Sequence, residues 1–278
     1  MSQFKDKIAI VTGAGSGIGR ALCLELARRG ATAIAADIDA DTARQTAEAI
    51  TRDGGRAKAL QVDVTSEEQV GRLVDGTVSE FGRLDYIFNN AGIAIGGEMR
   101  DLTVDHWRRV LNVDLYGVLH GTIAAYKVMV KQGFGHIVNI ASAAGLLPMP
   151  LNAPYSTCKH AVVGLSLSLR IEAQDLGVKV SCVCPGYIES NIYQSTVVNA
   201  AQDRAMKQIT QKKVSTARAA EEILEGVAAN RGMIVFPAYI NRAWFMYRLF
   251  PSRLEGMALK RVREFRTRQN EGGGRKES

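Results

Sequence analysis

Tyr155 and Lys159 are a pair of residues in the sequence that could perform acid–base chemistry. A free tyrosine phenol has a pKa of about 10, too high for efficient proton abstraction at neutral pH. If the segment is helical, the four-residue spacing places both side chains on one face, where the ammonium favours the phenolate. Such a pair could move a proton while a separate cofactor carries a hydride. On its own, the spacing also fits an ordinary pair on a helix surface.

A glycine-rich run early in the chain could bind that cofactor. Residues 8–12 predict a buried strand and residues 20–29 a helix, so the run at 13–19 lies in a strand–turn–helix context. Glycines allow a tight turn and a close approach of the backbone to a pyrophosphate, which the helix N-terminus attracts. The alternative is a tight turn that binds no ligand. The expected contacts are Gly13, Ser16, Gly17, Ile18 and Gly19.

Asp37, with Ile38 beside it, ends a second predicted strand at 32–36. In dinucleotide-binding folds an acid at this place accepts a hydrogen bond from the ribose 2′-hydroxyl. Its charge would repel a 2′-phosphate by roughly 4 kcal/mol at about 4 Å and an effective dielectric constant of about 20. We therefore expect NAD to be preferred over NADP. Asp37 could instead cap the next helix or serve as a turn residue.

Seven short motifs follow one another along the chain: TGAGSGIG at 12–19, DV at 63–64, NNAG at 89–92, Asn112, Ser142, YSTCK at 155–159 and PG at 185–186. Their order and spacing resemble the short-chain dehydrogenase/reductase family over about residues 5–236. Each motif alone is weak, whereas the complete set is specific. The resemblance implies an NAD(P)-dependent oxidoreductase that acts on CH–OH groups.

The resemblance also implies roles for single residues. Tyr155 would be the base in oxidation and the acid in reduction, and Lys159 would also hold the nicotinamide ribose. Ser142 would orient the substrate oxygen, and Asn112 would hold a water that links Lys159 to solvent. Ser190 stands where the family often has threonine, and it keeps the hydroxyl. The other implied cofactor contacts are Asp63, Val64, Asn90, Ala91, Gly92, Pro185, Gly186 and Ile188.

Strand and helix patterns alternate along the chain. Strands are expected near 8–12, 32–36, 58–62, 86–89, 136–140, 179–184 and 233–236, with long helices near 103–131 and 154–175. This alternation predicts a single α/β domain over 1–237, with a Rossmann-type, doubly wound, seven-stranded parallel sheet. The motifs would meet at the carboxyl ends of its strands, where such folds bind ligands. A helical C-terminal extension would occupy 238–278.

Composition narrows the class of protein further. With 278 residues and 46% hydrophobic residues, the chain can bury a sizeable core. It has no apolar run long enough to span a membrane and no evident signal peptide, so we expect a cytoplasmic protein. The four cysteines and four histidines show no metal-binding spacing, and no metal is expected.

The C-terminal extension departs from the family pattern. Residues 242–268 hold eight basic side chains against two acidic ones, which is +6 of the net charge of +7. Aromatic residues are concentrated in the same region, and an apolar stripe follows Pro251. Such a segment fits a peripheral membrane contact, or a cover over the protein's own pocket or a second subunit. No nucleic-acid-binding module is recognisable, and residues 271–278 are expected to be disordered.

The expected substrate is a small lipophilic secondary alcohol or ketone. Apolar residues dominate the segments that would line its pocket, which are Leu146, Leu147, Pro148, Met149, Tyr187, Ile192 and Tyr193, with 190–217 expected to move over the site. An NADP-linked reductase of 3-oxoacyl thioesters and a non-catalytic cofactor-binding regulator are the alternatives. By resemblance to the family, a homodimer or homotetramer is expected, paired through helices near 103–131 and 154–175.

Overall fold

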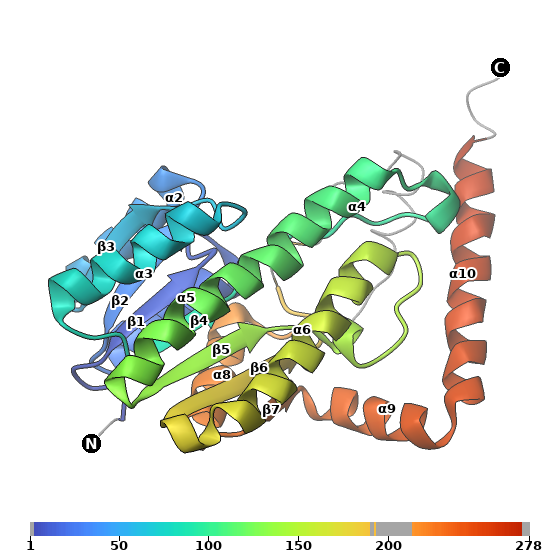
Figure 1. Ribbon diagram of the computed structural model, residues 1–278. Helices are drawn as coiled ribbons and strands as arrows, with labels where there is room; N and C mark the ends of the chain where they lie inside the picture. Colours follow the sequence, from blue (N-terminus) through green and yellow to red (C-terminus); the bar gives the residue numbers. More distant parts are fainter. Residues whose placement is uncertain (1–2, 190–191, 193–212, 274–278) are drawn as a thin grey trace.

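The computed structural model describes residues 3–189, 192 and 213–273, with side chains up to Thr267 (Figure 1). All strand pairings are parallel, and the single sheet has the order β3-β2-β1-β4-β5-β6-β7. Its strands are β1 (Ile8–Thr12), β2 (Thr32–Asp37), β3 (Arg56–Gln61), β4 (Tyr86–Asn89), β5 (Gly135–Ile140), β6 (Val178–Pro185) and β7 (Met233–Phe236). The predicted Rossmann-type, seven-stranded parallel sheet is confirmed.

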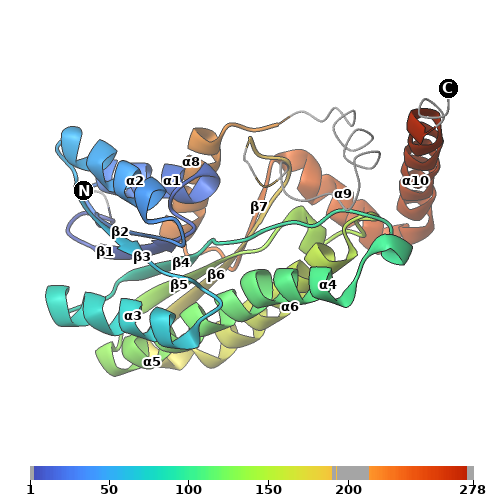
Figure 2. The ribbon, with the colours of Figure 1, turned by 90° about the horizontal axis from the view of Figure 1, so that it is seen from above.

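Helices cover both faces of the sheet, which gives three layers (Figure 2). One face carries α1 (Gly17–Arg28), α2 (Ala40–Arg52) and α8 (Thr216–Ala228). The other face carries α3 (Glu67–Phe81), α5 (Gly117–Gln132) and α6 (Ala153–Glu172). The short helices are η1 (Met99–Asp101), α4 (Val104–Leu111), η2 (Asn112–Tyr116), η3 (Ala143–Gly145) and η4 (Gln174–Leu176).

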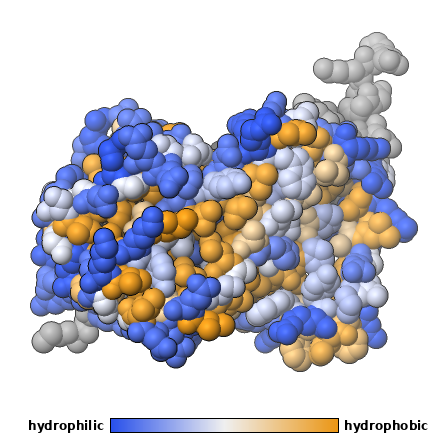
Figure 3. Space-filling view, in the orientation of Figure 1, coloured by the Kyte–Doolittle hydropathy of each residue, from blue (hydrophilic) through white to orange (hydrophobic). Residues whose placement is uncertain are grey.

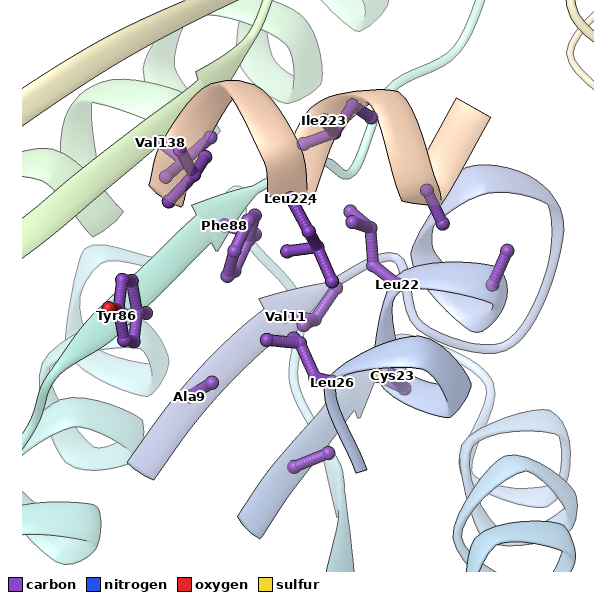
Figure 4. Close-up of a cluster of buried hydrophobic side chains, with 14 of the residues drawn as sticks. Ala9, Val11, Leu22, Cys23, Leu26, Tyr86, Phe88, Val138, Ile223 and Leu224 are labelled. Atoms are coloured by element: carbon purple, nitrogen blue, oxygen red, sulfur yellow. The ribbon is translucent and has the colours of Figure 1, made fainter. Parts of the chain in front are cut away.

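Both faces of the central strands are buried, which explains why a strand such as β1 is a continuous apolar run. The edge strand β3 is more polar and partly exposed. Alternate residues of β1 point to opposite faces, so Val11 belongs to one core cluster and Ile10 to the other. Figure 4 shows the first cluster, in which Val11 and Phe88 of the sheet meet Leu22 and Leu224 of the covering helices. This core fixes the end of β1, and with it the turn that enters α1.

The long helix expected over 103–131 is interrupted. The chain runs through α4, then the five-residue π-helical segment η2, then α5. A π segment adds a residue to one turn and so rotates the side chains that follow it. Within η2 only Asp114 is buried.

After β7 the predicted helical extension is present as α9 (Ala238–Leu249) and α10 (Pro251–Gly273). Ile240 of α9 is buried, and Trp244 packs on a core cluster between β6 and α6. Helix α10 stands at the edge of the molecule beside the loop that precedes α4 (Figures 1 and 2). It continues to Gly273, so residues 271–273 of the tail expected to be disordered are helical, and 274–278 lie outside the described residues.

Candidate active site

The glycine turn after β1 brings the start of α1 to the carboxyl edge of the sheet. Gly13 and Gly17 have φ angles of 64° and 54°, a conformation that glycine adopts without strain. At Gly19 there is no space for a side chain, because a Cβ atom would lie 2.0 Å from the carbonyl oxygen of Gly13. Ser16 precedes the helix without capping it through its side chain. The first N–H groups of α1 therefore suit a pyrophosphate.

The loop after β4 is tied to this glycine turn. The Asn90 side chain donates to the carbonyl oxygens of Thr12 (2.9 Å) and Gly13 (3.3 Å). The Thr12 hydroxyl accepts the backbone N–H groups of Asn90 (3.0 Å) and Ala91 (3.1 Å). These bonds join the two loops into one edge of a cleft, where their backbones can approach a ligand.

Asp37 lies at the end of β2 and faces the glycine turn. Its Oδ2 accepts the N–H of Gly15 (2.8 Å) and its Oδ1 accepts the N–H of Asp39 (3.0 Å). The role of helix cap belongs to Asp39, whose side chain accepts the N–H groups of Asp41 and Thr42. Asp37 is thus a fixed negative charge beside the turn.

Asp63 and Val64 follow β3 at the same edge of the sheet. The Asp63 carboxylate accepts the N–H (2.9 Å) and the hydroxyl (2.8 Å) of Thr65. Val64 is buried against Gly117 of α5, where a Cβ atom would meet its side chain at 2.8 Å. Ile38 is 62% exposed and extends the apolar surface on this side of the cleft.

Tyr155 and Lys159 lie one turn apart on α6, with the Lys159 Nζ 5.3 Å from the centroid of the Tyr155 ring. Ser142 reaches the same place from the end of β5. Its hydroxyl oxygen accepts the N–H of Ala144 (3.1 Å), and its side chain lies close enough to Tyr155 to act on the pKa of the phenol, which it lowers against the effect of burial. The three side chains predicted to do the chemistry are therefore brought together.

Lys159 has two fixed oxygen partners. Its Nζ donates to the carbonyl oxygen of Ile140 (3.1 Å) and lies 3.0 Å from Oδ2 of Asp114. The side chains of Lys159 and Asp114 are 3% and 0% exposed. The other carboxylate oxygen of Asp114 accepts the N–H of Ile93 (2.8 Å). The ammonium is held in one position under the Tyr155 ring.

Asn112 does not reach this site. It is exposed at the start of η2, whereas Asp114, two residues later, lies against Lys159. The resemblance to the family implied that Asn112 holds a water next to Lys159, whereas the structure brings Asp114 to that place. Asp114 was missed, and its only signal in the sequence is a charged residue in an otherwise buried helix face.

Opposing effects act on the ionisation of these groups. Burial raises the pKa of Tyr155, and the Lys159 ammonium acts in the opposite direction. Burial disfavours the Lys159 ammonium, but attraction by Asp114 and Tyr155 outweighs it and raises the pKa of Lys159. Burial also raises the pKa of Asp114 against the attraction of Lys159. The 3.0 Å contact and the Ile93 N–H favour the ionised pair.

A cavity of about 420 Å³ connects the glycine turn to Tyr155. Gly186, directly after β6, lines it, and its N–H donates to the Phe236 carbonyl oxygen (2.8 Å). Ser190 and most of the expected mobile segment 190–217 lie outside the described residues. The predicted contacts that line the cavity are Gly13, Ser16, Gly17, Ile18, Asp37, Ile38, Asp63, Val64, Asn90, Ala91, Gly92, Ser142, Tyr155, Lys159, Pro185, Gly186 and Ile188.

The fold and this site define a dinucleotide-binding α/β protein, with a Tyr–Lys pair at the carboxyl edge of its sheet. The family model described as short chain dehydrogenase matches residues 7–201. The chain belongs to the short-chain dehydrogenase family and is an oxidoreductase.

Individual relatives agree with this assignment. The chain is 35% identical over 241 residues to the putative oxidoreductase SadH of Mycobacterium tuberculosis, covering 84% of this chain and 87% of that protein. It is 36% identical over 192 residues to a cyclohexanol dehydrogenase of an Acinetobacter species, covering 68% and 76%. A short-chain dehydrogenase/reductase from Burkholderia phymatum, solved in complex with NAD, superposes with a TM-score of 0.85 at 29% identity, covering 91% and 97%.

Proposed function

We propose that the protein transfers a hydride between NAD and a lipophilic secondary alcohol or ketone, with Tyr155 as the general acid and base. The observation that carries this proposal is the cavity that joins the glycine turn to the Ser142–Tyr155–Lys159 cluster. A bound nicotinamide would accept or supply the hydride. The remaining chemistry is the transfer of one proton, which the chain itself can perform.

The cavity fits a dinucleotide for specific reasons. A Cβ atom at Gly13 would lie 2.8 Å from the Cα of Ala91, so a side chain there would intrude on the cleft between the two loops. The start of α1 offers N–H groups to a pyrophosphate. The fixed Asp37 carboxylate accepts a ribose hydroxyl and opposes a 2′-phosphate, which supports NAD over NADP. The relative solved with NAD supports the same choice.

The proton would move through Tyr155. In alcohol oxidation the phenolate takes the hydroxyl proton, and in ketone reduction the phenol returns it to the carbonyl oxygen. Ser142 is placed to hold the substrate oxygen because it lines the same cavity as Tyr155 and lies beside the phenol. Lys159 stabilises the phenolate from below the ring and stands ready to hold the nicotinamide ribose.

The substrate side of the cavity supports a lipophilic compound. Ile93, Val113 and Ile192 line it close to the catalytic cluster. Apolar walls with a few polar groups at the reacting end are typical of small-molecule pockets. The similarity to a cyclohexanol dehydrogenase points to the same substrate class.

A substrate panel tests the proposed reaction. NADH or NADPH formation would be followed with NAD and NADP in parallel, across secondary alcohols from short aliphatic to steroid-sized. We expect turnover with NAD that increases with apolar bulk. Turnover only with NADP and 3-oxoacyl thioesters would favour the alternative reductase. NAD binding without turnover of any alcohol or ketone would favour the non-catalytic role.

We also propose a homodimer formed through α5 and α6. Each of these helices presents large exposed apolar side chains, namely Ile123 on α5 and Leu167 and Ile171 on α6, the last 76% exposed. Burying such residues against a second copy is favourable at roughly 25 cal/mol per Å². An Ile171→Asp variant that remained the same size as the wild type in sedimentation would contradict this assembly.

The outer face of α9 supports a peripheral contact with an anionic membrane surface. Phe245 is 62% and Leu249 is 54% exposed, and the helix contains arginines but no acidic residue. Figure 3 shows apolar side chains gathered at the position of α9 and bordered by hydrophilic ones. Exposed apolar groups flanked by cations suit the interface of an anionic bilayer. Among the described residues no helix is long and apolar enough to cross a membrane.

Co-sedimentation with vesicles tests this contact. We expect the wild type to bind vesicles that contain an anionic lipid, less so at high salt, and the Phe245→Ser/Leu249→Ser variant to lose binding. Val104→Ser, at a residue 71% exposed on α4, is the matched control and should bind like the wild type. Wild-type protein that stays in the supernatant with anionic vesicles would exclude the contact. If the Phe245→Ser/Leu249→Ser variant changed the oligomeric state but not vesicle binding, the outer face of α9 would be a contact with a second copy of the chain.

A further inference from the structure

Asp114 places a negative charge next to the positive charge of Lys159 in the proposed catalytic pair. It approaches Lys159 from η2, at 3.0 Å and with no exposed surface. Its second oxygen is fixed by the Ile93 N–H at 2.8 Å. A Cβ atom at Gly92 would lie 3.0 Å from Oδ2 of Asp114, so the loop after β4 closes tightly over the pair. The carboxylate cannot turn away from the ammonium without breaking these contacts.

The groups that face Tyr155 come from three elements. Lys159 and Cys158 belong to α6, Asp114 belongs to η2, and Ser142 belongs to the end of β5. Burial raises the pKa of Tyr155 most, Lys159 lowers it, and Asp114 raises it again. Burial raises the pKa of the Cys158 thiol to about 12, so this group is neutral at working pH.

Two more thiols lie near the ammonium on β6. Lys159 acts electrostatically on both Cys182 and Cys184, which are buried and 4.0 Å apart. The hydrogen bond between the two thiols lowers the pKa of Cys182 and raises that of Cys184. The two charged side chains that act on the phenol most strongly are Lys159 and Asp114, and as an ion pair they have a net charge of zero rather than plus one.

We propose that Asp114 is a positioning residue that keeps Tyr155 protonated at neutral pH, so that the site is set for ketone reduction there and needs alkaline pH for alcohol oxidation. This inference rests on the proposed function. In reduction, the hydride from the reduced nicotinamide forms a C–H bond at the carbonyl carbon. The Tyr155 O–H bond breaks, its proton goes to the carbonyl oxygen, and the phenolate remains. In oxidation the phenolate must already be present to take the alcohol proton.

The Asp114→Asn variant tests the proposal, since it keeps the shape and the acceptor for the Ile93 N–H but removes the charge. The phenolate then becomes the counter-ion of Lys159, so the two groups titrate as a pair. We expect the midpoint of the rising pH profile of oxidation to fall by about one pH unit or more. At one pH unit, the oxidation rate at pH 7 would rise by roughly tenfold relative to the alkaline plateau. Asp105→Asn, which removes an exposed carboxylate on α4, should leave the midpoint unchanged.

A direct titration of the phenol needs no turnover, and its only variant is a folded Tyr155→Phe protein that serves as the reference. Ultraviolet difference spectra of the wild type, with the Tyr155→Phe spectrum subtracted, report ionisation of Tyr155 alone. We expect Tyr155 to remain protonated through neutral pH in the wild type. Ionisation of wild-type Tyr155 below neutral pH would overturn the proposal, and so would a folded Asp114→Asn protein with an unchanged or higher midpoint. Absence of turnover together with the expected titration would count against the proposed function alone.

Discussion

At the scale of single residues, the decisive feature is the fixed position of the Lys159 ammonium. The Ile140 carbonyl oxygen and the Asp114 carboxylate hold it at 3.1 Å and 3.0 Å. Burying a charge is costly unless it is paired with an opposite charge. The Lys159 ammonium and the Asp114 carboxylate therefore each depend on the other to remain buried and ionised. A similar logic applies to Asp37, whose two backbone hydrogen bonds fix its charge at the cofactor cleft.

Removing only Lys159 should destabilise the protein strongly. Lys159→Met leaves the fully buried Asp114 without its counter-ion, which costs about 3–5 kcal/mol in comparable buried pairs. Chemical denaturation would measure the loss. The double variant Lys159→Met/Asp114→Leu should recover most of the stability while remaining inactive. If the double variant were no more stable than Lys159→Met, the pair would not be the cause.

Changing Asp37 should alter the choice of cofactor. Asp37→Ser removes the negative charge next to the glycine turn and keeps a small polar group. Relief of repulsion of roughly 4 kcal/mol at short range predicts that the NADP-to-NAD ratio of kcat/KM rises by at least about tenfold. Asp41→Ser on α2, which is 71% exposed in its side chain, is the control. An unchanged ratio would show that Asp37 does not discriminate between the ribose 2′-hydroxyl of NAD and the 2′-phosphate of NADP.

At the scale of elements, close packing around glycines sets the positions of the helices that carry the site. Gly121 lets α5 approach β4, because a Cβ atom there would lie 2.0 Å from Oδ1 of Asn89. Asn89 belongs to a buried hydrogen-bonded set with Thr122 and Asn139 that cannot move independently. The backbone of α5, and the π segment before it, are placed by this contact.

A pair of glycine substitutions tests the packing of α5. Gly121→Ala should lower the free energy of unfolding by about 1–3 kcal/mol, since it overpacks a buried polar network. Gly76→Ala, on α3 where a Cβ atom meets nothing within 4 Å, should raise it by roughly 0.5–1 kcal/mol through reduced backbone freedom. Thermal or urea unfolding would measure both. Equal effects at the two positions would contradict the close approach of α5.

The elements also show what the sequence could and could not predict. The strands were predicted to within a few residues because buried parallel strands are short apolar runs between glycine-rich turns. Motif residues that follow those strands, such as Asp37 and Ser142, were placed correctly at the same edge. The π segment was missed because its energy comes from contacts made only in the folded state, such as the Asp114–Lys159 pair. The role that the family resemblance implied for Asn112 was placed two residues before Asp114, which is the residue that lies against Lys159.

At the scale of the whole molecule, the C-terminal extension is fastened to the body at two places. Ile240 is buried next to Gly186 at the cofactor cleft. Phe265 is 2% exposed, and Arg266 donates to both carboxylate oxygens of Glu98, as close as 2.8 Å. Helix α10 therefore returns to the loop before α4, beside the substrate side of the site. Burial raises the pKa of Tyr187 there, and the positive charge of Arg261 on α10 acts in the opposite direction.

The attachment of α10 should depend on acid pH. The Arg266 hydrogen bonds hold the pKa of Glu98 below its usual range, against the effect of burial. The stabilisation is thus complete above the unfolded-state pKa of about 4.3 and is lost as the pH falls through the lower folded-state value. The protection of the α10 amides from hydrogen exchange, relative to the intrinsic exchange rate at each pH, should fall in that range. Arg266→Met should lower this protection already at neutral pH, whereas Arg263→Met on the same helix should not. Slow exchange in Arg266→Met would show that the Arg266–Glu98 pair does not fasten the helix.

The most direct test of the central claim compares the wild type with Tyr155→Phe in NADH formation from NAD and a secondary alcohol, with NAD binding measured on both proteins. Loss of a general acid–base group costs about 10²–10⁴-fold in rate. We predict a loss of that size in Tyr155→Phe, with NAD affinity essentially unchanged. Equal turnover by the two proteins would contradict the assignment of Tyr155 as the proton-transferring group.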